Sequence, residues 1–386
     1  MSISIAQLPP HALAAYETDT RALMAELGLA REDVLDLGLG DSSEPVVPFI
    51  RQALIEAVTT TTHYPAAAGL PALREAVAGW AGRRFGARLD PDTQVMPTQG
   101  SKEAIFSLAF VAREPGKDVV ALTVPGYAIP ERGARVAGLE PLPLTLDAAH
   151  DFLPDLDAID EATWDRLAVF WVNYPNNPTG ATAPRELYAE LAERARHHGF
   201  VLASDEAYTE LWWDEPTASV LELDSLENVV AYHSLSKRSG LTGYRTGFAA
   251  GDPALIAAAR KYRSMAGGAA TEFVQRAAAA AWVDEDHVAE RRELIGAKRA
   301  VLRDGLEAAG LPVAGSRAGL FLWAAAPGGA SDAFARTLLE RGVAVVPGRY
   351  FGEGGEGWLR LAPVPSLEDC RVAAQRIEEA ARAWTS

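Results

Sequence analysis

The 386-residue sequence has a single cysteine, Cys370, which excludes an internal disulfide and any zinc site built from cysteines. It also has no run of 18 apolar residues, the length that a membrane-spanning helix requires. The first ten residues lack the basic and apolar segments of a signal peptide. We therefore expect a cytoplasmic protein that does not bind a membrane, with Cys370 as a packing thiol in a helix near the C-terminus.

Basic residues are also scarce, with 36 lysines and arginines against 52 acidic residues and a net charge of −16. A nucleic-acid-binding surface needs a basic patch, so we expect no nucleic-acid partner. The sequence has no Walker A loop, no GxSxG and no HExxH, and we predict no metal site. The composition, 48% apolar and 23% charged, is typical of globular enzymes, and the length predicts two domains.

Short β-branched, apolar runs alternate with helical patterns through the middle of the chain. Four such runs are predicted as strands, at Asp118–Val124, Leu167–Asn173, Phe200–Ala203 and Asn228–His233. Apolar residues at helical spacing predict helices between them, such as Pro184–His198. Runs buried on both faces and separated by helices indicate an α/β fold with a mostly parallel sheet. Ligands bind such sheets at the carboxyl ends of the strands, where the polar clusters of this sequence lie.

The pattern changes after about residue 280. A long charged helix (Asp284–Ala308) is followed by short strands and a closing helix, an α+β layout. The strands are predicted at Gly319–Ala324, Val343–Val346 and Trp358–Ala362, and the closing helix at Leu367–Trp384. We predict a large domain over residues 41–280 and a smaller domain that combines residues 281–386 with 1–40. A continuous helix is expected to join them.

The densest group of polar side chains follows the fourth predicted strand. Hydroxyls of Ser234 and Ser236 precede Lys237, and Arg245 comes eight residues after it. A lysine amine can form an imine with the aldehyde of pyridoxal phosphate, while hydroxyls and an arginine fork can hold the phosphate dianion. A solvated basic loop is the alternative interpretation. The position of Arg245 and the trailing Gly247 favour the cofactor site.

Two further clusters end the second and third predicted strands. Asp205 could pair with a protonated ring nitrogen and so keep the ring an electron sink, and Tyr208 could reach the ring's phenolic oxygen. The Asn177 amide could donate to the same oxygen and to a substrate carboxylate. Alternatively, the first cluster is a helix cap with a packed tyrosine and the second a structural Pro/Asn turn.

Three other positions fit an anion or a ring. Ser101 stands at a predicted helix start, where backbone N–H groups can bind phosphate, although this motif by itself favours a simple capping turn. Tyr127 follows the first predicted strand and could stack on a ring or pack in the core. Arg360 lies within an apolar strand and needs an anion, which could be a substrate carboxylate or an internal acid.

Taken in order, the motifs GSKE, PGY, NNPTG, SDEAY, SLSK and GYRTG resemble those of the class I/II aminotransferases, and the resemblance runs from about Gly38 to Arg360. It implies a fold-type I enzyme that uses pyridoxal 5'-phosphate to move an amino group between an amino acid and a 2-oxo acid. Implied catalytic residues are Lys237, Asp205 and Tyr208. Implied cofactor contacts are Ser101, Lys102, Tyr127, Asn177, Asp205, Tyr208, Ser234, Ser236, Lys237 and Arg245. Implied substrate contacts are Gly40, Asn177 and Arg360.

The resemblance also implies a homodimer with shared active sites, because Tyr64 matches a tyrosine that family members lend to the neighbouring subunit's phosphate. The segment Tyr64–Ala76 and the one around Lys237 are similar to those of N-succinyldiaminopimelate aminotransferases of lysine biosynthesis. That similarity implies N-succinyl-LL-diaminopimelate and 2-oxoglutarate as substrates. Ser42 departs from the family pattern, in which a proline follows Gly-Glu or Gly-Asp. The alternatives are an aminotransferase for another amino acid, a pyridoxal-phosphate-dependent β-eliminating lyase, and a non-catalytic cofactor-binding regulator.

Overall fold

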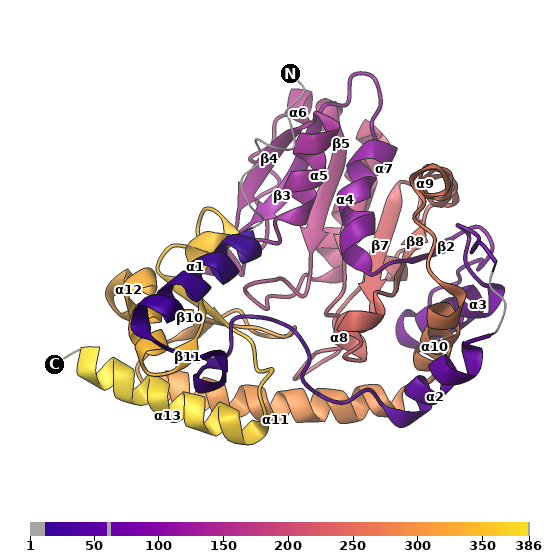
Figure 1. Cartoon of the computed structure of the whole chain (residues 1–386). Coiled ribbons are helices and arrows are strands. Elements are labelled where there is room, and N and C mark those ends of the chain that lie inside the picture. Colours follow the sequence, from indigo (N-terminus) through magenta and orange to yellow (C-terminus); the bar gives the residue numbers. More distant parts are fainter. Residues whose placement is uncertain (1–11, 60–62, 385–386) are drawn as a thin grey trace.

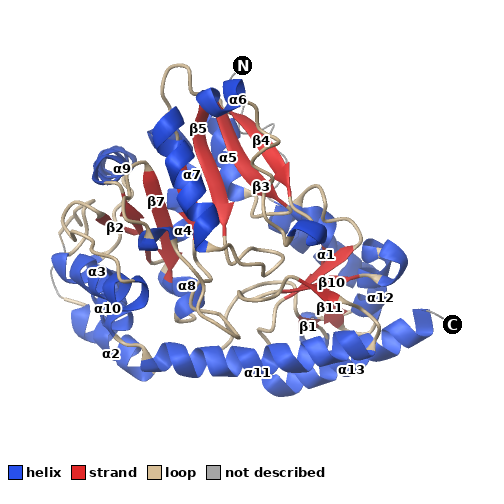
Figure 2. Cartoon of the chain, turned by 180° about the vertical axis from the view of Figure 1, so that it is seen from behind, coloured by secondary structure: helices blue, strands red, loops and turns tan. Residues whose placement is uncertain are grey.

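A computed structural model describes residues 12–59 and 63–384 of the chain. Its centre is a sheet of seven strands, in which only β8 runs antiparallel to its neighbours (Figures 1 and 2). In spatial order the strands are β2 (Val95–Thr98), β8 (Gly247–Gly251), β7 (Val229–Ser234), β6 (Val201–Asp205), β5 (Leu167–Asn173), β3 (Val119–Val124) and β4 (Glu140–Thr145). The mostly parallel sheet between helices confirms the predicted α/β class.

Helices cover both faces of this sheet, and alternate strand residues enter one of two hydrophobic cores. On one face pack α4 (Ser101–Val111), α5 (Ile129–Ala137) and α9 (Pro253–Ala266). On the other pack α3 (Pro71–Phe85), α7 (Arg185–His198) and α10 (Glu272–Val283). The strands are therefore buried on both sides, which explains their continuous apolar sequences. Short α6 (Glu161–Arg166) precedes β5, and α2 (Pro48–Ala57) packs against α10.

Two smaller sheets lie beside the large one. One pairs β1 (Leu35–Asp36) with β11 (Val343–Ala344). The other contains β12 (Val346–Pro347), β13 (Trp358–Leu361), β10 (Leu322–Ala325) and β9 (Val313–Ala314), in that order. The single strand predicted at Val343–Val346 is therefore wrong, because Val345 separates two short strands that pair in different sheets.

Helices enclose these smaller sheets and their own core, which includes the buried Cys370. They are α1 (Ala12–Leu27), α12 (Ser331–Glu340) and α13 (Leu367–Trp384). The long helix α11 (Asp286–Ala308) runs from the α10 end of the molecule to α13 (Figure 1). It therefore connects the large sheet with the smaller ones. The predicted boundary at residue 280 falls inside α10, and the division into domains stays a prediction.

Two strands of the large sheet, β4 and β8, have sequences that do not predict a strand. The edge strand β4 contains Pro141 and Pro143, which cannot donate to a ladder and are tolerated only where one side of a strand is unpaired. Strand β8 consists of two glycines, two alanines and one phenylalanine, and glycine and alanine have little strand preference. Neither shows the β-branched run that predicts β3, β5, β6 and β7.

Within the described residues, no helix is both long and apolar enough to cross a membrane. The same part of the chain holds no group of three or more His, Cys, Asp or Glu side chains suited to a metal ion.

Candidate active site

The carboxyl ends of β5, β6 and β7 meet at one edge of the large sheet and carry polar residues there. Asn173 is in register with Asp205, and Asp205 is in register with Tyr232, two residues before Ser234. The Asn173 side chain donates to the Asp205 carbonyl at 2.9 Å and accepts from the Asn177 backbone N–H at 2.9 Å. The sheet thus aligns three loops that the sequence separates by about thirty residues each.

A cavity of about 470 Å³ opens at this edge. Of the sequence-predicted site residues, it is lined by Gly40, Ser101, Lys102, Tyr127, Asn177, Asp205, Tyr208, Ser234, Ser236, Lys237, Arg245 and Arg360. Tyr64 is the exception: it lies outside the cavity with its side chain fully exposed.

Lys237 stands in the four-residue helix α8 (Leu235–Arg238), directly after β7. Ser234 caps this turn by accepting the Ser236 backbone N–H at 3.1 Å. The Lys237 amine donates to the Gly40 carbonyl and lies 6.0 Å from the centre of the Tyr208 ring. Burial lowers the pKa of Lys237 to about 8, against the opposing charge of Asp41. An amine with this pKa is neutral in a larger fraction of molecules near neutral pH than an ordinary lysine, and a nucleophile or base must be neutral.

Asp205 is 4% exposed at the end of β6. Burial raises its pKa to about 7, although the Ala207 backbone N–H donates to its carboxylate at 3.2 Å. No lysine, arginine or histidine within the described residues forms an ion pair with it. A buried carboxylate of this kind is stabilised by a cation in the cavity, and a protonated ring nitrogen fits that requirement.

An anion cradle lies where α4 begins. Gly100 precedes the helix with φ of +75°, and a side chain there would meet Arg245, because a Cβ atom would lie 2.6 Å from its guanidinium. The Arg245 guanidinium donates to the Thr242 carbonyl at 3.0 Å and lines the cavity together with Lys102. Burial and the Arg245 charge lower the pKa of Lys102. The helix start, two cations and the nearby hydroxyls of Ser101, Ser234 and Ser236 suit a phosphate dianion.

Arg360 is 1% exposed in β13 and faces the same cavity. Its guanidinium donates to Asn177 Oδ1 at 2.9 Å and to the Gly38 carbonyl at 2.5 Å, and it lies 4.1 Å from the centre of the Phe321 ring. Its partners within the described residues are thus neutral, and no acid forms an ion pair with it. Burial lowers the pKa of Arg360 to about 10. A carboxylate bound in the cavity would supply the missing counter-charge.

Sequence reasoning missed several residues that line the cavity. Asp41, Thr242 and Gly243 stand beside predicted positions, so adjacency was the available signal. Glu17 comes from α1 and Phe321 from the loop before β10, and no motif marks either of them. Burial also raises the pKa values of Tyr127 and Tyr208 well above the ordinary value, which keeps both phenols protonated.

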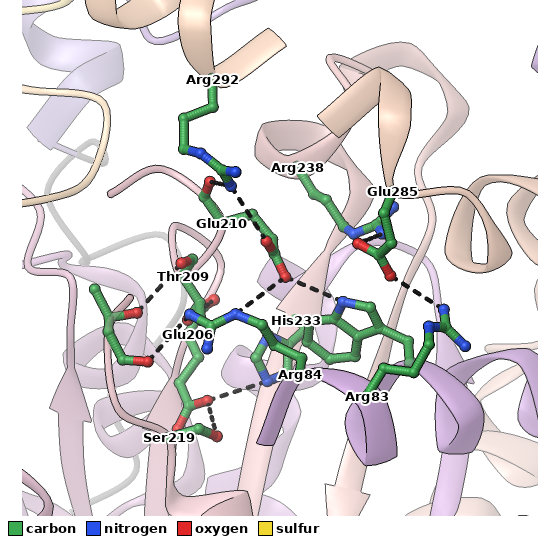
Figure 3. Close-up of polar contacts among 12 residues, drawn as sticks. Arg83, Arg84, Glu206, Thr209, Glu210, Ser219, His233, Arg238, Glu285 and Arg292 are labelled. Carbon is green, nitrogen blue, oxygen red and sulfur yellow. Dashed lines mark hydrogen bonds and ion pairs between the residues drawn. The ribbon is translucent and has the colours of Figure 1, made fainter. Parts of the chain in front are cut away.

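The chain neighbours of Asp205 and Lys237 form polar contacts of their own (Figure 3). Glu206 accepts from the Ser219 hydroxyl at 2.5 Å and lies 3.1 Å from the His233 ring. Arg238, next to Lys237, pairs with Glu285 at 3.1 Å and donates to the Ala281 carbonyl at 2.6 Å. These contacts hold the residue that follows β6 and the turn α8 in place.

Comparison with known proteins shows the family of the chain. The family model described as aminotransferase class I and II matches residues 32–377. An LL-diaminopimelate aminotransferase from Nitratidesulfovibrio vulgaris is 38% identical over 384 residues, which cover 97% of each chain. The crystal structure of an aminotransferase from Neisseria meningitidis has a TM-score of 0.90 at 32% identity and covers 98% of this chain and 99% of that one.

A probable N-succinyldiaminopimelate aminotransferase from Thermus thermophilus has a TM-score of 0.86 at 33% identity, covering 96% of this chain and all of that one. These relatives share the whole architecture and not only the sheet. With a cavity that offers an amine, a buried carboxylate and an anion cradle, the chain belongs to the class I and II aminotransferases and is a pyridoxal-phosphate-dependent transaminase.

Proposed function

We propose that the cavity at the edge of the large sheet is the active site and that Lys237 is its central residue. The observation that carries this proposal is the gathering of a partly neutral amine, a buried carboxylate and a buried guanidinium around one space, the last two without an ion pair within the described residues. Pyridoxal phosphate, when bound, supplies an aldehyde that condenses with amines and a ring that withdraws electrons from the amino-bearing carbon.

The cofactor's phosphate is assigned to the anion cradle at the start of α4, with contacts from Ser101, Lys102, Ser234, Ser236 and Arg245. Its ring is assigned to the space between Tyr127 and the end of β6. There Asp205 holds the ring nitrogen protonated, because a cation offsets the burial of its carboxylate. Tyr208 and Asn177, both buried, donate toward the ring's phenolic oxygen.

Arg360 binds the α-carboxylate of the substrate, together with Asn177 and the backbone at Gly40. This contact holds the amino-bearing carbon beside the Lys237 amine. The Lys237 amine, when neutral, would take the proton from that carbon and pass it on within the cavity, and its contact with the Gly40 carbonyl would orient it.

For the amino donor we propose a diaminopimelate, with 2-oxoglutarate as acceptor, in lysine biosynthesis. The relatives named above are associated with both LL-diaminopimelate and its N-succinyl derivative. The cavity charges favour the free amino acid. Arg360, Arg245, Lys102 and Asp205 are matched by the α-carboxylate, the phosphate and the ring nitrogen, and Lys237 is neutral when it acts as a base, so the acids Glu17 and Asp41 remain to contact the rest of the donor. These acids attract the distal ammonium of the free amino acid, which N-succinylation replaces with a neutral amide and an added carboxylate that the acids repel.

A donor panel tests this assignment. Purified holoenzyme is mixed with LL-diaminopimelate, N-succinyl-LL-diaminopimelate, lysine or glutamate, and the loss of the cofactor's visible absorbance is followed in single turnover. We expect kcat/KM to be highest for LL-diaminopimelate. Equal or higher kcat/KM for the N-succinyl compound would contradict the charge argument and favour the acylated donor. Glu17→Gln should lower the preference for the free amino acid, whereas Glu26→Gln, farther along α1, should not.

We further propose that the active unit is a homodimer with shared sites. The Tyr64 side chain is fully exposed. The apolar side chains of Ile55 and Val58, at the end of α2, are more than half exposed. A second cavity of about 730 Å³ borders Lys102 and Arg245 from outside. A neighbouring subunit could place Tyr64 there, against the phosphate, and cover the exposed apolar side chains.

Subunit complementation tests the shared site. Lys237→Ala and Tyr64→Ala proteins are each purified, mixed under conditions of proven subunit exchange, and assayed. If Tyr64 serves the neighbour, each heterodimer has one doubly damaged site and one intact site, so activity recovers toward half of wild type per heterodimer. Absence of recovery would assign Tyr64 to its own subunit.

A further inference from the structure

Arg291, on the second turn of α11, contacts two separate segments of the active site. Its Nε donates to the backbone carbonyl of Lys237 at 3.1 Å. Its Nη1 donates to the Glu44 carboxylate at 2.9 Å and to the Ser42 hydroxyl at 3.2 Å. The guanidinium thus bridges the turn that carries the lysine and the loop that follows Gly40.

Ser42 and Glu44, the loop residues that Arg291 contacts, make further contacts of their own. The Ser42 hydroxyl donates to Glu44 at 2.5 Å, and the buried Lys298 pairs with the other Glu44 oxygen at 2.5 Å. Burial opposes ionisation of Glu44, but hydrogen bonds from Lys298 and Ser42 and the charge of Arg291 lower its pKa to about 2. The carboxylate is therefore ionised at neutral pH and binds both cations.

The loop at Ser42, the turn that carries Lys237 and helix α11 are in close contact. Gly240, just after the lysine turn, has φ of +69°, and a Cβ atom there would lie 2.9 Å from the Ser42 hydroxyl and 3.0 Å from Arg291 Nη1. A side chain at this position would push the loop or the guanidinium away. The loop, the turn and α11 are therefore packed as one unit.

We propose that Arg291, held by Ser42 and Glu44, is a positioning residue that fixes the Lys237 amine against the Gly40 loop. The contacts form a closed circuit: the Lys237 amine meets the Gly40 carbonyl, the loop continues to Ser42 and Glu44, and Arg291 returns to the Lys237 backbone. Ser42 stands where the family pattern has proline, which has no hydroxyl to donate. The inference rests on the proposed role of Lys237.

Arg291 is not required merely to attach the lysine turn to α11. Arg238 already binds Glu285 at 3.1 Å, and the Ser239 hydroxyl lies 2.8 Å from the His287 ring. Both contacts join the turn to the beginning of the same helix. What Arg291 adds is the connection to the loop, so its loss should affect the geometry of the amine more than the fold.

Arg291→Lys tests this, because it keeps the charge and loses the fork. The control is Arg292→Lys, the next residue of α11, whose guanidinium contacts Glu210 and the Trp212 ring. For Arg291→Lys we expect kcat to fall between about tenfold and 10²-fold, with KM for the donor changed less than threefold, because a misplaced reacting group affects turnover more than binding.

A spectroscopic readout accompanies the kinetics. The visible absorbance of cofactor bound to Lys237 is titrated with pH in the holoenzyme. Because the Arg291 charge favours the neutral lysine nitrogen, moving that charge away should raise the midpoint. Arg292→Lys should leave both kcat and the midpoint unchanged. A thermal melt of each variant checks that it is folded.

Ser42→Ala removes only one hydroxyl and provides the second test, with Ser43→Ala as its control, since Ser43 donates to the Val364 carbonyl instead. Ser42→Ala should lower kcat severalfold, and its effect should be non-additive with that of Arg291→Lys. If both variants are folded and match wild type in kcat and midpoint, the positioning role is refuted. If Arg291→Lys does not fold, Ser42→Ala decides alone. Borohydride fixation of the cofactor onto Lys237 tests the lysine's own role separately.

Discussion

Replacing Asp205 with asparagine should keep the cofactor bound and remove most of the turnover. Burial moves the pKa of this carboxyl from 3.8 to about 7. At ~1.36 kcal/mol per pKa unit, this shift means that the protein disfavours the ionised carboxylate by about 4 kcal/mol when no cation is near it. A cationic ring nitrogen offsets this cost and is held protonated in return. Asparagine has no charge to hold that proton, so we expect kcat to fall by about 10²–10³-fold.

The assay compares kcat for Asp205→Asn and wild type at saturating donor and acceptor, with cofactor content measured by absorbance after borohydride treatment. Glu206→Gln is the matched control, because Glu206 is the next residue and also a buried acid, but it binds Ser219 behind the sheet. That control should lose thermal stability while kcat per bound cofactor stays within a few fold of wild type. An Asp205→Asn rate within threefold of wild type would show that Asp205 is only a cap for the turn after β6.

Lys237→Ala should abolish turnover and borohydride fixation while the circular dichroism spectrum stays unchanged; wild-type transamination by this variant would refute the proposed site. Tyr64→Phe should raise the cofactor Kd about tenfold or more, the worth of one hydrogen bond to a charged group, as measured by equilibrium dialysis. Because the pKa of Glu44 is depressed to about 2, its contribution to stability is present above its unfolded pKa of ~4.3 and is lost as pH falls toward 2. The free energy of unfolding of wild type should therefore drop more steeply from about pH 5 to pH 2 than that of Glu44→Gln in urea titrations; parallel curves would contradict the assigned ion pairs.

Most of the large sheet could be predicted from the sequence, because its strands are buried on both faces and their apolar runs are continuous. The strand at Leu167–Asn173 and the helix at Leu367–Trp384 match the structure residue for residue. Strand β4 could not be found, since its two prolines are acceptable only at a sheet edge and sequence does not reveal which strand is the edge. The predicted strand at Val343–Val346 was wrong for a related reason, because two-residue strands leave no periodic signal.

The cavity residues that follow strands were predictable, because parallel strands bring their carboxyl ends together. Glu17 could not be predicted as a cavity residue, because it reaches the cavity from a helix whose position depends on packing against distant segments. Ser42 was visible only as a departure from a pattern. Its contact with Arg291, 249 positions away in the chain, appears only in the folded molecule.

Arg360 has a thermodynamic consequence for the empty enzyme. Its guanidinium is taken out of water during folding, with neutral oxygens and aromatic rings for partners. Taking the guanidinium out of water therefore lowers the free energy of unfolding. Binding of a carboxylate does not include this desolvation cost again. Any small carboxylate that enters the cavity should raise the melting temperature, because it binds the native state alone. Since the guanidinium is buried, that stabilisation should depend only weakly on ionic strength.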